Sequence, residues 1–453
     1  MTTQSTTRSA ARSGADILAF DRSYVFHPWR RQQDRSSMVI TGGEGLYFFD
    51  DAGKRYLDFH SGWGHMTLGH QPRPVLDAIA AQLNELSNIM PGFAHAPAAL
   101  LGACLAAIVP VPLGKSFFAT SGTEAIDVAV KMARAYTGRF KIIARYRSYH
   151  GNNYGAGVLS GDPRRIPLEP GMPGVVHALD CYCYRCPFKL TYPQCEVHCA
   201  EHIAQLIELE GPGTVAAVLA EPVVASNGGL VPPAEYWPKL RAICDHYGVL
   251  LIADEVVTGI GRTGEWFACD HWGVVPDILV LAKGLSAGIM PLSATVVTQA
   301  IADFFEANYL DAGLTYQSHP LSCAAGIATL RYIQEHDLLD HVRKMGSYLL
   351  AGLRDLQQRH PSIGDVRGLG LYGTLELVSA RRARTPLIPW STVDMPNPTA
   401  QAINQRLLAR GVKTALRWNR LAVAPPLIID KQGIDEGLAA IDYALEVADE
   451  ACA

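Results

Sequence analysis

The chain has 453 residues, of which 49% are hydrophobic and 18% are charged, and its formal net charge is -4. This composition excludes a globally disordered chain, and the near-balanced charge gives no indication of a nucleic-acid or anionic-membrane partner. No apolar run is long enough to span a bilayer. The length exceeds the usual size of a single core, so two domains or one large elaborated domain are expected.

Residues 1–20 are predicted to form a flexible tail. Their polar, Ser/Thr/Arg-rich and acid-poor composition also resembles an organelle transit peptide, but it lacks the apolar stretch of a secretory signal. Of the ten cysteines, five lie within residues 181–199 and the others are scattered. Scattered cysteines in a large apolar chain are typical of reduced, buried thiols, which indicates a cytoplasmic protein.

Apolar runs alternate with helical patterns through the middle of the chain. A small hairpin is predicted over Tyr47–Asp58, with Asp51-Ala52-Gly53 as its turn. Strands are then predicted at Ser116–Ala119, Lys141–Arg145, Val215–Ala220, Val249–Ala253 and Ile278–Leu281, and helices at Thr123–Tyr136, His202–Leu209, Ala234–His246 and Gly433–Glu450. Continuous apolar strands separated by helices favour a parallel sheet that is covered on both faces.

This layout predicts an α/β protein of two domains. Residues 67–319 are expected to form a large domain with a mostly parallel sheet. Residues 21–66 and 320–453 are expected to form a smaller α+β domain from both chain ends. Open α/β sheets bind ligands at the carboxyl ends of their strands, so the residues that follow each strand are the candidates for function.

The first candidate is Thr120-Ser121-Gly122-Thr123-Glu124-Ala125, between a strand and a helix. A turn of small residues at a helix N-terminus offers free N–H groups and the positive end of the helix dipole, which suits a phosphate. The alternative is an ordinary helix cap, with Ser121 or Thr123 as the capping residue.

The second candidate is Asp254-Glu255, directly after an apolar strand. A carboxylate in a dry site could pair with a protonated ring nitrogen and keep that nitrogen cationic. A magnesium-binding pair or a solvated strand end would fit the same residues.

The third candidate is Lys283, which follows another apolar strand and precedes Gly284. Loss of solvent lowers the pKa of a lysine and makes its amine nucleophilic. The alternative is a lysine whose charged end reaches the surface.

Together these three pieces would hold pyridoxal 5'-phosphate (PLP), and the chain resembles the class III (omega-amino acid) aminotransferases of PLP fold type I from about Tyr47 to Asp449. The matching motifs occur in the order of the family: Tyr56–Gly62, Leu68-Gly69-His70, Ser121–Ala125, Tyr149-His150-Gly151, Glu221-Pro222, Asp254-Glu255-Val256, Thr258–Gly264, Ala282-Lys283-Gly284, Thr315–Pro320 and Ala424–Leu427.

The resemblance implies a role for each matching residue. Lys283 would hold the cofactor as a Schiff base and move the substrate proton, and Asp254 would pair with the ring nitrogen. The other expected contacts are Tyr149 and Val256 on the two ring faces, Ser121, Gly122 and Thr123 at the phosphate, and His150 and Glu221 near the cofactor. Thr315 would bind the phosphate of the neighbouring subunit, which implies a homodimer, or a tetramer, with shared active sites.

The substrate residues are less clearly marked. The family often binds the substrate carboxylate with an arginine at the position where this chain has Ala415, and Arg417 lies two residues further on. In a strand, residues i and i+2 share a face, so Arg417 could reach the same pocket, or it could be a surface or interface residue. Trp63 and Tyr24 are candidates to line the pocket, with core or interface aromatics as the alternative.

The cluster of Cys181, Cys183, Cys186, Cys195 and Cys199 has a zinc-like composition but lacks paired CxxC motifs. It resembles an insertion in relatives of the taurine–pyruvate aminotransferase type, where no metal is recognised. Packed thiols or one labile disulfide are the expected state, and no metal is predicted.

The predicted function is a transaminase that moves an amino group from an omega-amino acid or amine to a keto acid such as pyruvate, with ping-pong kinetics. A PLP-dependent lyase, decarboxylase or aminomutase would use the same Lys283 and Asp254. A non-catalytic binding protein is the third possibility. The sequence does not indicate the donor.

Overall fold

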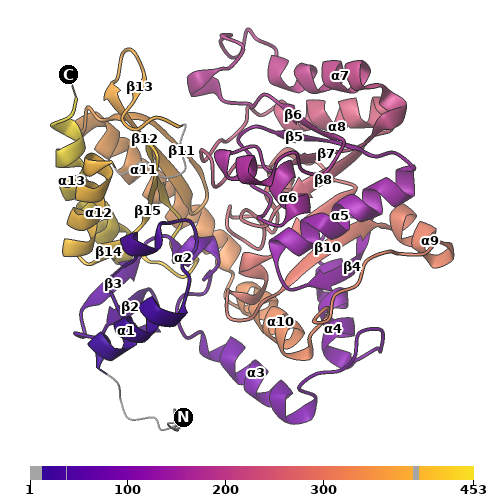
Figure 1. The fold of residues 1–453 in the computed structure, drawn as a ribbon, viewed down its shortest axis with the longest axis horizontal. Coiled ribbons are helices and arrows are strands. Elements are labelled where there is room, and N and C mark those ends of the chain that lie inside the picture. Colours follow the sequence, from indigo (N-terminus) through magenta and orange to yellow (C-terminus); the bar gives the residue numbers. More distant parts are fainter. Residues whose placement is uncertain (1–12, 37, 391–396, 453) are drawn as a thin grey trace, which may run out of the picture.

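The computed structural model describes residues 13–36, 38–390 and 397–452. A seven-stranded sheet lies in its larger part, on the right in Figure 1. In spatial order the strands are β4 (Leu113–Ala119), β10 (Ser293–Thr298), β9 (Ile278–Leu281), β8 (Leu250–Asp254), β7 (Val215–Ala220), β5 (Lys141–Arg145) and β6 (Val175–Ala178). Strand β10 is antiparallel to both of its neighbours, and the pairs from β9 to β6 are parallel. The predicted mostly parallel sheet is confirmed, although β6 and β10 were not among the predicted strands.

Helices cover both faces of this sheet. Side chains of β7 alternate between two apolar clusters: Val218 belongs to the one that includes α7 (His198–Glu210) and α8 (Tyr236–Tyr247), and Leu219 to the one that includes α5 (Gly122–Thr137). The shorter helices α6 (Tyr154–Leu159) and α9 (Gln299–Ala307) also contact α5. The inner strands β7, β8 and β9 are therefore buried on both faces, as their continuous apolar sequences predicted.

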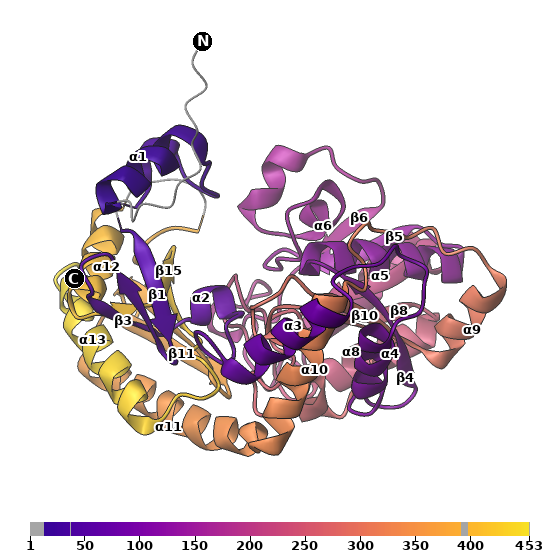
Figure 2. The same ribbon diagram turned by 90° about the horizontal axis from the view of Figure 1, so that it is seen from below.

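The two chain ends meet in a pair of smaller sheets. One contains β1 (Ile40–Glu44), β2 (Tyr47–Asp50), β3 (Arg55–Asp58) and β14 (Val412–Lys413), and the other contains β11 (Ile363–Leu369), β12 (Tyr372–Ala380), β16 (Arg420–Val423), β15 (Ala415–Arg417) and the short β13 (Thr385–Pro386). Strand β14 pairs with β3 in parallel, so N-terminal and C-terminal segments lie side by side (Figure 2). The smaller part built from both ends is confirmed, and its exact boundaries at 66/67 and 319/320 stay a prediction.

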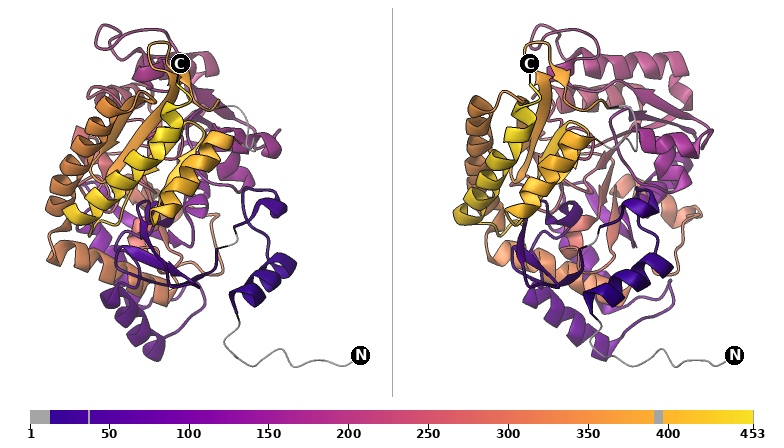
Figure 3. Two further views of the ribbon diagram at one scale, coloured as in Figure 1. Left: turned by 90° about the vertical axis from the view of Figure 1, so that its left-hand side faces the viewer. Right: turned by 60° about the vertical axis from the view of Figure 1, so that its left-hand side comes forward.

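The C-terminal helices lie on the outer face of the β11–β15 sheet (Figure 3). They are α11 (Leu338–Arg359), α12 (Pro398–Ala409) and α13 (Lys431–Asp449), and α10 (Pro320–Glu335) leads to them from the large sheet. The helices α2 (Ser61–Gly64), α3 (Arg73–Glu85) and α4 (Ala96–Ala106) connect the N-terminal strands to β4.

The predicted tail 1–20 is only partly within the described residues, because residues 1–12 lie outside them. From Gly14 the chain forms helix α1 (Gly14–Tyr24) rather than a tail. Ser13 and Asp16 form a reciprocal cap at its first turn, a local signal that starts a helix even in a polar segment. None of the described helices combines the length and the apolar character that crossing a membrane would need.

Candidate active site

The carboxyl ends of the central strands bring together the predicted cofactor residues around one cavity of about 570 Å³. Its lining includes Ser121, Gly122, Thr123, Tyr149, His150, Glu221, Asp254, Val256 and Lys283. The sheet order explains the convergence, because β4, β5, β7, β8 and β9 all end at this edge. Of the predicted cofactor contacts, Thr315 is the one that does not line this cavity.

The turn after β4 is both a helix cap and a free helix N-terminus. Ser121 Oγ accepts a hydrogen bond from the Glu124 amide at 3.3 Å, and Glu124 Oε2 accepts from the Thr120 and Ser121 amides at 2.9 and 3.0 Å. The capping alternative is therefore correct, yet it leaves the amides of Gly122 and Thr123 without partners in the helix. A helix N-terminus of this kind can bind a phosphate.

Two further contacts shape this turn. A Cβ added at Gly122 would lie 3.0 Å from a methyl group of Val256, so a larger residue would crowd the cavity wall. Thr123 Oγ1 accepts a hydrogen bond from the Asn152 amide at 3.2 Å, which leaves its hydroxyl proton free to be donated to a phosphate oxygen.

Replacing Ser121 with alanine is expected to weaken both the helix cap and cofactor binding. Loss of the cap should lower the free energy of unfolding by about 1 kcal/mol, and the PLP dissociation constant should rise because the turn loses its order. Fluorescence titration of the apoenzyme with PLP measures the second effect. Ser13→Ala, at the equivalent cap of α1, is the matched control and should leave PLP affinity unchanged; an unchanged affinity in Ser121→Ala would contradict the role of the turn.

Asp254 lies at the end of β8 and is held from two sides. Its Oδ2 lies 2.6 Å from Nδ1 of His150, and its Oδ1 accepts a hydrogen bond from the Val256 amide at 3.0 Å. Both side chains of the His150–Asp254 pair are buried. A donor at Nδ1 stabilises the charged carboxylate, which is the form that can pair with a protonated ring nitrogen in the cavity.

Glu221 follows β7 and is hydrogen-bonded to two loops of the site. Its Oε1 accepts from the Tyr149 amide at 3.0 Å and its Oε2 from the Ala225 amide at 2.9 Å. Burial and the nearby charge of Asp254 raise the pKa of Glu221 to about 7. The sequence predicted that Glu221 lies near the cofactor, and the structure shows that both of its carboxylate oxygens accept hydrogen bonds from main-chain amides.

Lys283 follows β9 and reaches the centre of the site. Its backbone is left-handed, with φ of 37°, a conformation that costs a non-glycine residue about 1–3 kcal/mol. Burial lowers the pKa of its amine, while Asp254 and Glu221 oppose that shift. A lowered pKa increases the fraction of the amine that is neutral and nucleophilic.

A second cavity of about 280 Å³ adjoins the first, and Lys283 and Tyr149 line both. The predicted substrate residues Trp63 and Arg417 line this second cavity, and so does Ala415, as expected for alternate residues of one strand. Burial and the charge of Arg164 lower the pKa of Arg417 to about 10, so its guanidinium remains protonated at neutral pH. Trp63 is 56% exposed and lies at the entrance.

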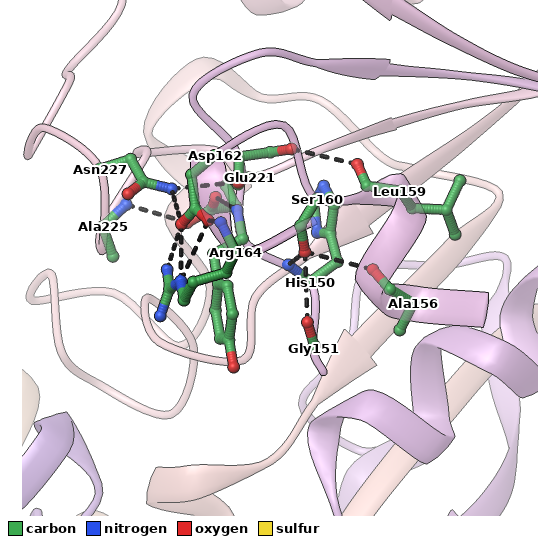
Figure 4. A network of polar contacts seen from close by, with 12 residues as sticks. His150, Gly151, Ala156, Leu159, Ser160, Asp162, Arg164, Glu221, Ala225 and Asn227 are labelled. Carbon is green, nitrogen blue, oxygen red and sulfur yellow. Dashed lines mark hydrogen bonds and ion pairs between the residues drawn. The ribbon is translucent and has the colours of Figure 1, made fainter. Parts of the chain in front are cut away.

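The residues of the second cavity that the sequence reasoning missed include Trp29, Arg164 and Arg420. The guanidinium of Arg164 lies 3.6 Å from the centre of the Tyr149 ring and donates to Asp162 at 2.8 Å. Asn227 in turn donates to Asp162 at 2.9 Å, and Figure 4 shows this network beside Glu221 and His150. The Asp162-Pro163-Arg164 segment was the available signal, since an aspartate at a turn can cap the segment that follows.

Other predicted residues lie away from both cavities. Thr315 is exposed in a turn before α10 and lines neither cavity, so its expected role depends on a second subunit. Tyr24 is 80% exposed at the end of α1 and lines neither cavity, whereas Trp29 packs edge-to-face on Trp63 with ring centres 5.8 Å apart. Trp29, rather than Tyr24, is therefore the aromatic residue of this segment that lines the second cavity.

The cysteine-rich segment surrounds a small hollow of about 20 Å³. Cys181, Cys183, Cys186, Cys195 and Cys199 are all free thiols in the structure. Within residues 13–36, 38–390 and 397–452, no group of three or more His, Cys, Asp or Glu side chains is arranged to hold a metal ion.

The arrangement around the first cavity fits PLP. The α5 N-terminus suits its phosphate, Asp254 suits its ring nitrogen and Lys283 offers the amine that its aldehyde requires. Tyr149 and Val256 line the same cavity and can contact the two faces of a flat ring.

Comparison with known proteins agrees with this geometry. The family model "Aminotransferase class-III" matches residues 29–445. A taurine–pyruvate aminotransferase of Rhodobacter capsulatus is 35% identical, with 96% of this chain and 97% of the relative covered, and a leucine/methionine racemase of Thermococcus litoralis is 36% identical over 91% of each chain.

A solved structure extends the match to three dimensions. The taurine:2-oxoglutarate aminotransferase of Bifidobacterium kashiwanohense, solved with PLP and glutamate, superposes with a TM-score of 0.93 at 35% identity, covering 97% of this chain and 99% of its own. The predicted fold type I architecture and the PLP cofactor are confirmed. The protein belongs to the class III aminotransferases, the PLP-dependent family that its motifs predicted.

Proposed function

We propose that this transaminase takes its amino group from an omega-amino acid or amine whose acidic end, where present, binds Arg417, and passes it to a keto acid such as pyruvate. The supporting observation is that Lys283 lines both the cofactor cavity and the second cavity, which also contains Arg417. A substrate bound by Arg417 therefore has its other end near the amine of Lys283.

Each residue has a distinct part in this reaction. Bound PLP supplies the electron sink for the bond that breaks. Lys283 Nζ takes a proton from the substrate carbon and would pass it to a carbon of the cofactor. Asp254 would keep a different proton on the ring nitrogen. Trp29 and Trp63 reduce the access of water to the cavity mouth.

Donor and acceptor would occupy the same small cavity in turn, which predicts ping-pong kinetics. Donor alone should convert the cofactor to its amino form and release one equivalent of carbonyl product, and a keto acid should restore the aldehyde form. Absorbance spectroscopy and chromatography of the released cofactor measure this exchange. A lyase or decarboxylase would instead release ammonia or carbon dioxide, and an aminomutase would rearrange the donor; in each case the cofactor would end in the aldehyde form.

The relatives suggest which donors to examine first. Taurine and pyruvate appear in the name of one relative, and a putrescine–pyruvate aminotransferase of Pseudomonas aeruginosa is 31% identical. We therefore propose a panel of taurine, β-alanine, putrescine and an aryl amine with pyruvate. Preference for taurine and β-alanine would support recognition of an acidic end, and preference for putrescine would contradict it.

Replacing Arg417 with alanine should raise the Michaelis constant for an acidic donor by about ten- to a hundredfold, because the acid loses a charged partner in a buried site. The kcat for a donor without an acidic group should change much less. Arg381→Ala, a change at an arginine that lines neither cavity, is the control. An unaltered Michaelis constant for the acidic donor would remove Arg417 from the substrate site.

We also propose a homodimer, or a dimer of dimers, in which Thr315 completes the phosphate site of the neighbouring subunit. Co-expression of Lys283→Ala and Thr315→Glu chains tests this idea. A mixed dimer has one site with both defects and one site with neither, so it should regain activity that each variant lacks alone. No regain would contradict shared sites. The cytoplasmic location predicted from the cysteines stays a prediction.

A further inference from the structure

The second cavity contains two arginines that face each other across a hairpin. Strands β15 and β16 are antiparallel, and Arg417 is the direct partner of Arg420. Both residues line the cavity, and both guanidinium groups contact the Trp418 ring, at 4.4 and 4.8 Å from its centre. Like charges in directly opposed positions destabilise a hairpin, so the pair has no evident benefit for folding.

Arg420 is the more unusual of the two, because it is buried without a counterion. Its side chain is only 4% exposed, and Nε and Nη2 are buried without a hydrogen-bond partner. Among the described residues, no carboxylate forms an ion pair with it. A buried guanidinium that lacks an acceptor is costly, and it is expected where a ligand supplies the missing anion.

The acidic residue directly opposite Arg420 in the sheet already has other hydrogen-bond partners. Glu376 on β12 pairs directly with Arg420 in the sheet. Its carboxylate instead receives hydrogen bonds from four other groups: Tyr182, Arg185, Arg367 and Asn419. Glu376 is therefore not available to neutralise Arg420.

The remaining charges around Arg420 are mostly positive. Burial lowers the pKa of Arg420 to about 9, and the charges of Arg147 and Arg367 add to this shift, so the side chain is still protonated at neutral pH. Arg367 is itself paired with Asp365 and donates to the Gly228 carbonyl. Of Arg147, Arg367 and Arg420, it is Arg420 that lines the second cavity.

The surroundings of Arg417 and Arg420 differ. The charges that act most strongly on Arg417 are those of Arg164 and Asp162, beside Tyr149, whereas those on Arg420 come from Arg147 and the Tyr182 side. Thr374, on the neighbouring strand, lines the cavity together with Arg420. The cavity therefore offers two guanidinium groups, one from each strand of the hairpin, as partners for negative charge.

We propose that Arg420, with Thr374, forms a second anion-binding point, and that the enzyme takes an oxo-acid acceptor with two carboxylates. This inference rests on the proposed transaminase function: Arg417 binds one carboxylate and Arg420 the other. A cavity of about 280 Å³ has room for a small dicarboxylic acid.

The test compares acceptors in the second half-reaction alone, starting from enzyme with the cofactor in its amino form. The wild-type enzyme should have a higher kcat/KM for 2-oxoglutarate or oxaloacetate than for pyruvate. In Arg420→Met, the ratio of the dicarboxylic to the monocarboxylic value should fall by about tenfold or more, because one carboxylate loses a buried charged partner. Arg420→Lys, which keeps the charge, should recover part of the ratio.

Arg417→Met is the matched comparison on the opposite strand. It should lower kcat/KM for all three acceptors together, because each has the carboxylate next to its carbonyl, so the ratio should change little. A pyruvate preference in the wild type, or an unchanged ratio in a folded Arg420→Met or Arg420→Lys variant, would overturn the proposal. Failure of the donor to convert the cofactor in the first half-reaction would instead overturn the proposed function.

Discussion

Replacing Lys283 with alanine is expected to lower kcat by about four orders of magnitude or more, since both the nucleophilic amine and the proton carrier are lost. The position is specialised: the amine is buried, its pKa is lowered, and it lies where the two cavities meet. Steady-state kinetics with the best donor and pyruvate measure the loss. Borohydride should link the cofactor to the wild-type chain and not to the variant.

A surface lysine provides the control for this change. Lys344 on α11 pairs with Asp340 and lines neither cavity, so Lys344→Ala should keep wild-type kinetics and covalent trapping. If Lys283→Ala kept more than a small fraction of the activity, another amine would have to carry the chemistry.

Replacing Asp254 with asparagine is expected to lower kcat by about a hundred- to a thousandfold, because an uncharged partner does not hold the proton on the ring nitrogen. The neighbouring His150 would lose its carboxylate acceptor, which now lies 2.6 Å from Nδ1. Single-turnover kinetics with donor alone would place the loss in the proton-transfer step rather than in binding.

Asp270→Asn is a suitable comparison for this second change. Asp270 accepts a hydrogen bond from the Phe267 amide in a turn that lines neither cavity. This variant should differ from the wild type in stability at most. Equal activities of Asp254→Asn and the wild type would show that the ring nitrogen does not need a charged partner.

The cofactor side of the site could be predicted because its residues follow apolar strands. Lys141–Arg145, Val215–Ala220 and Ile278–Leu281 have the predicted bounds. The chain direction of parallel strands then puts Ser121, Glu221, Asp254 and Lys283 at one edge of the sheet. The strand pattern singled out Ser121, Asp254 and Lys283, and the family resemblance added Glu221.

The substrate side could be predicted only in part. Arg417 was found because it lies two residues beyond the position where the family has an arginine, on the same face of a strand. Arg420 depends instead on the register of the hairpin across Trp418, whose φ is 50°. Arg164 depends on a loop after α6 that approaches Tyr149 through a network with Asp162 and Asn227. Contacts between distant segments leave no periodic pattern in the sequence, so these residues became visible only in the folded chain.

The joining of the two chain ends has a consequence for biosynthesis. Ser61 Oγ donates to the Ala424 carbonyl at 2.7 Å, a contact between residues 363 positions apart. The central sheet can form while the ribosome is still translating, but the N-terminal strands must wait for β14 and its neighbours to emerge. Until then the nascent chain has an open sheet edge and no substrate cavity, which makes this interval the one in which a chaperone would have most effect on yield.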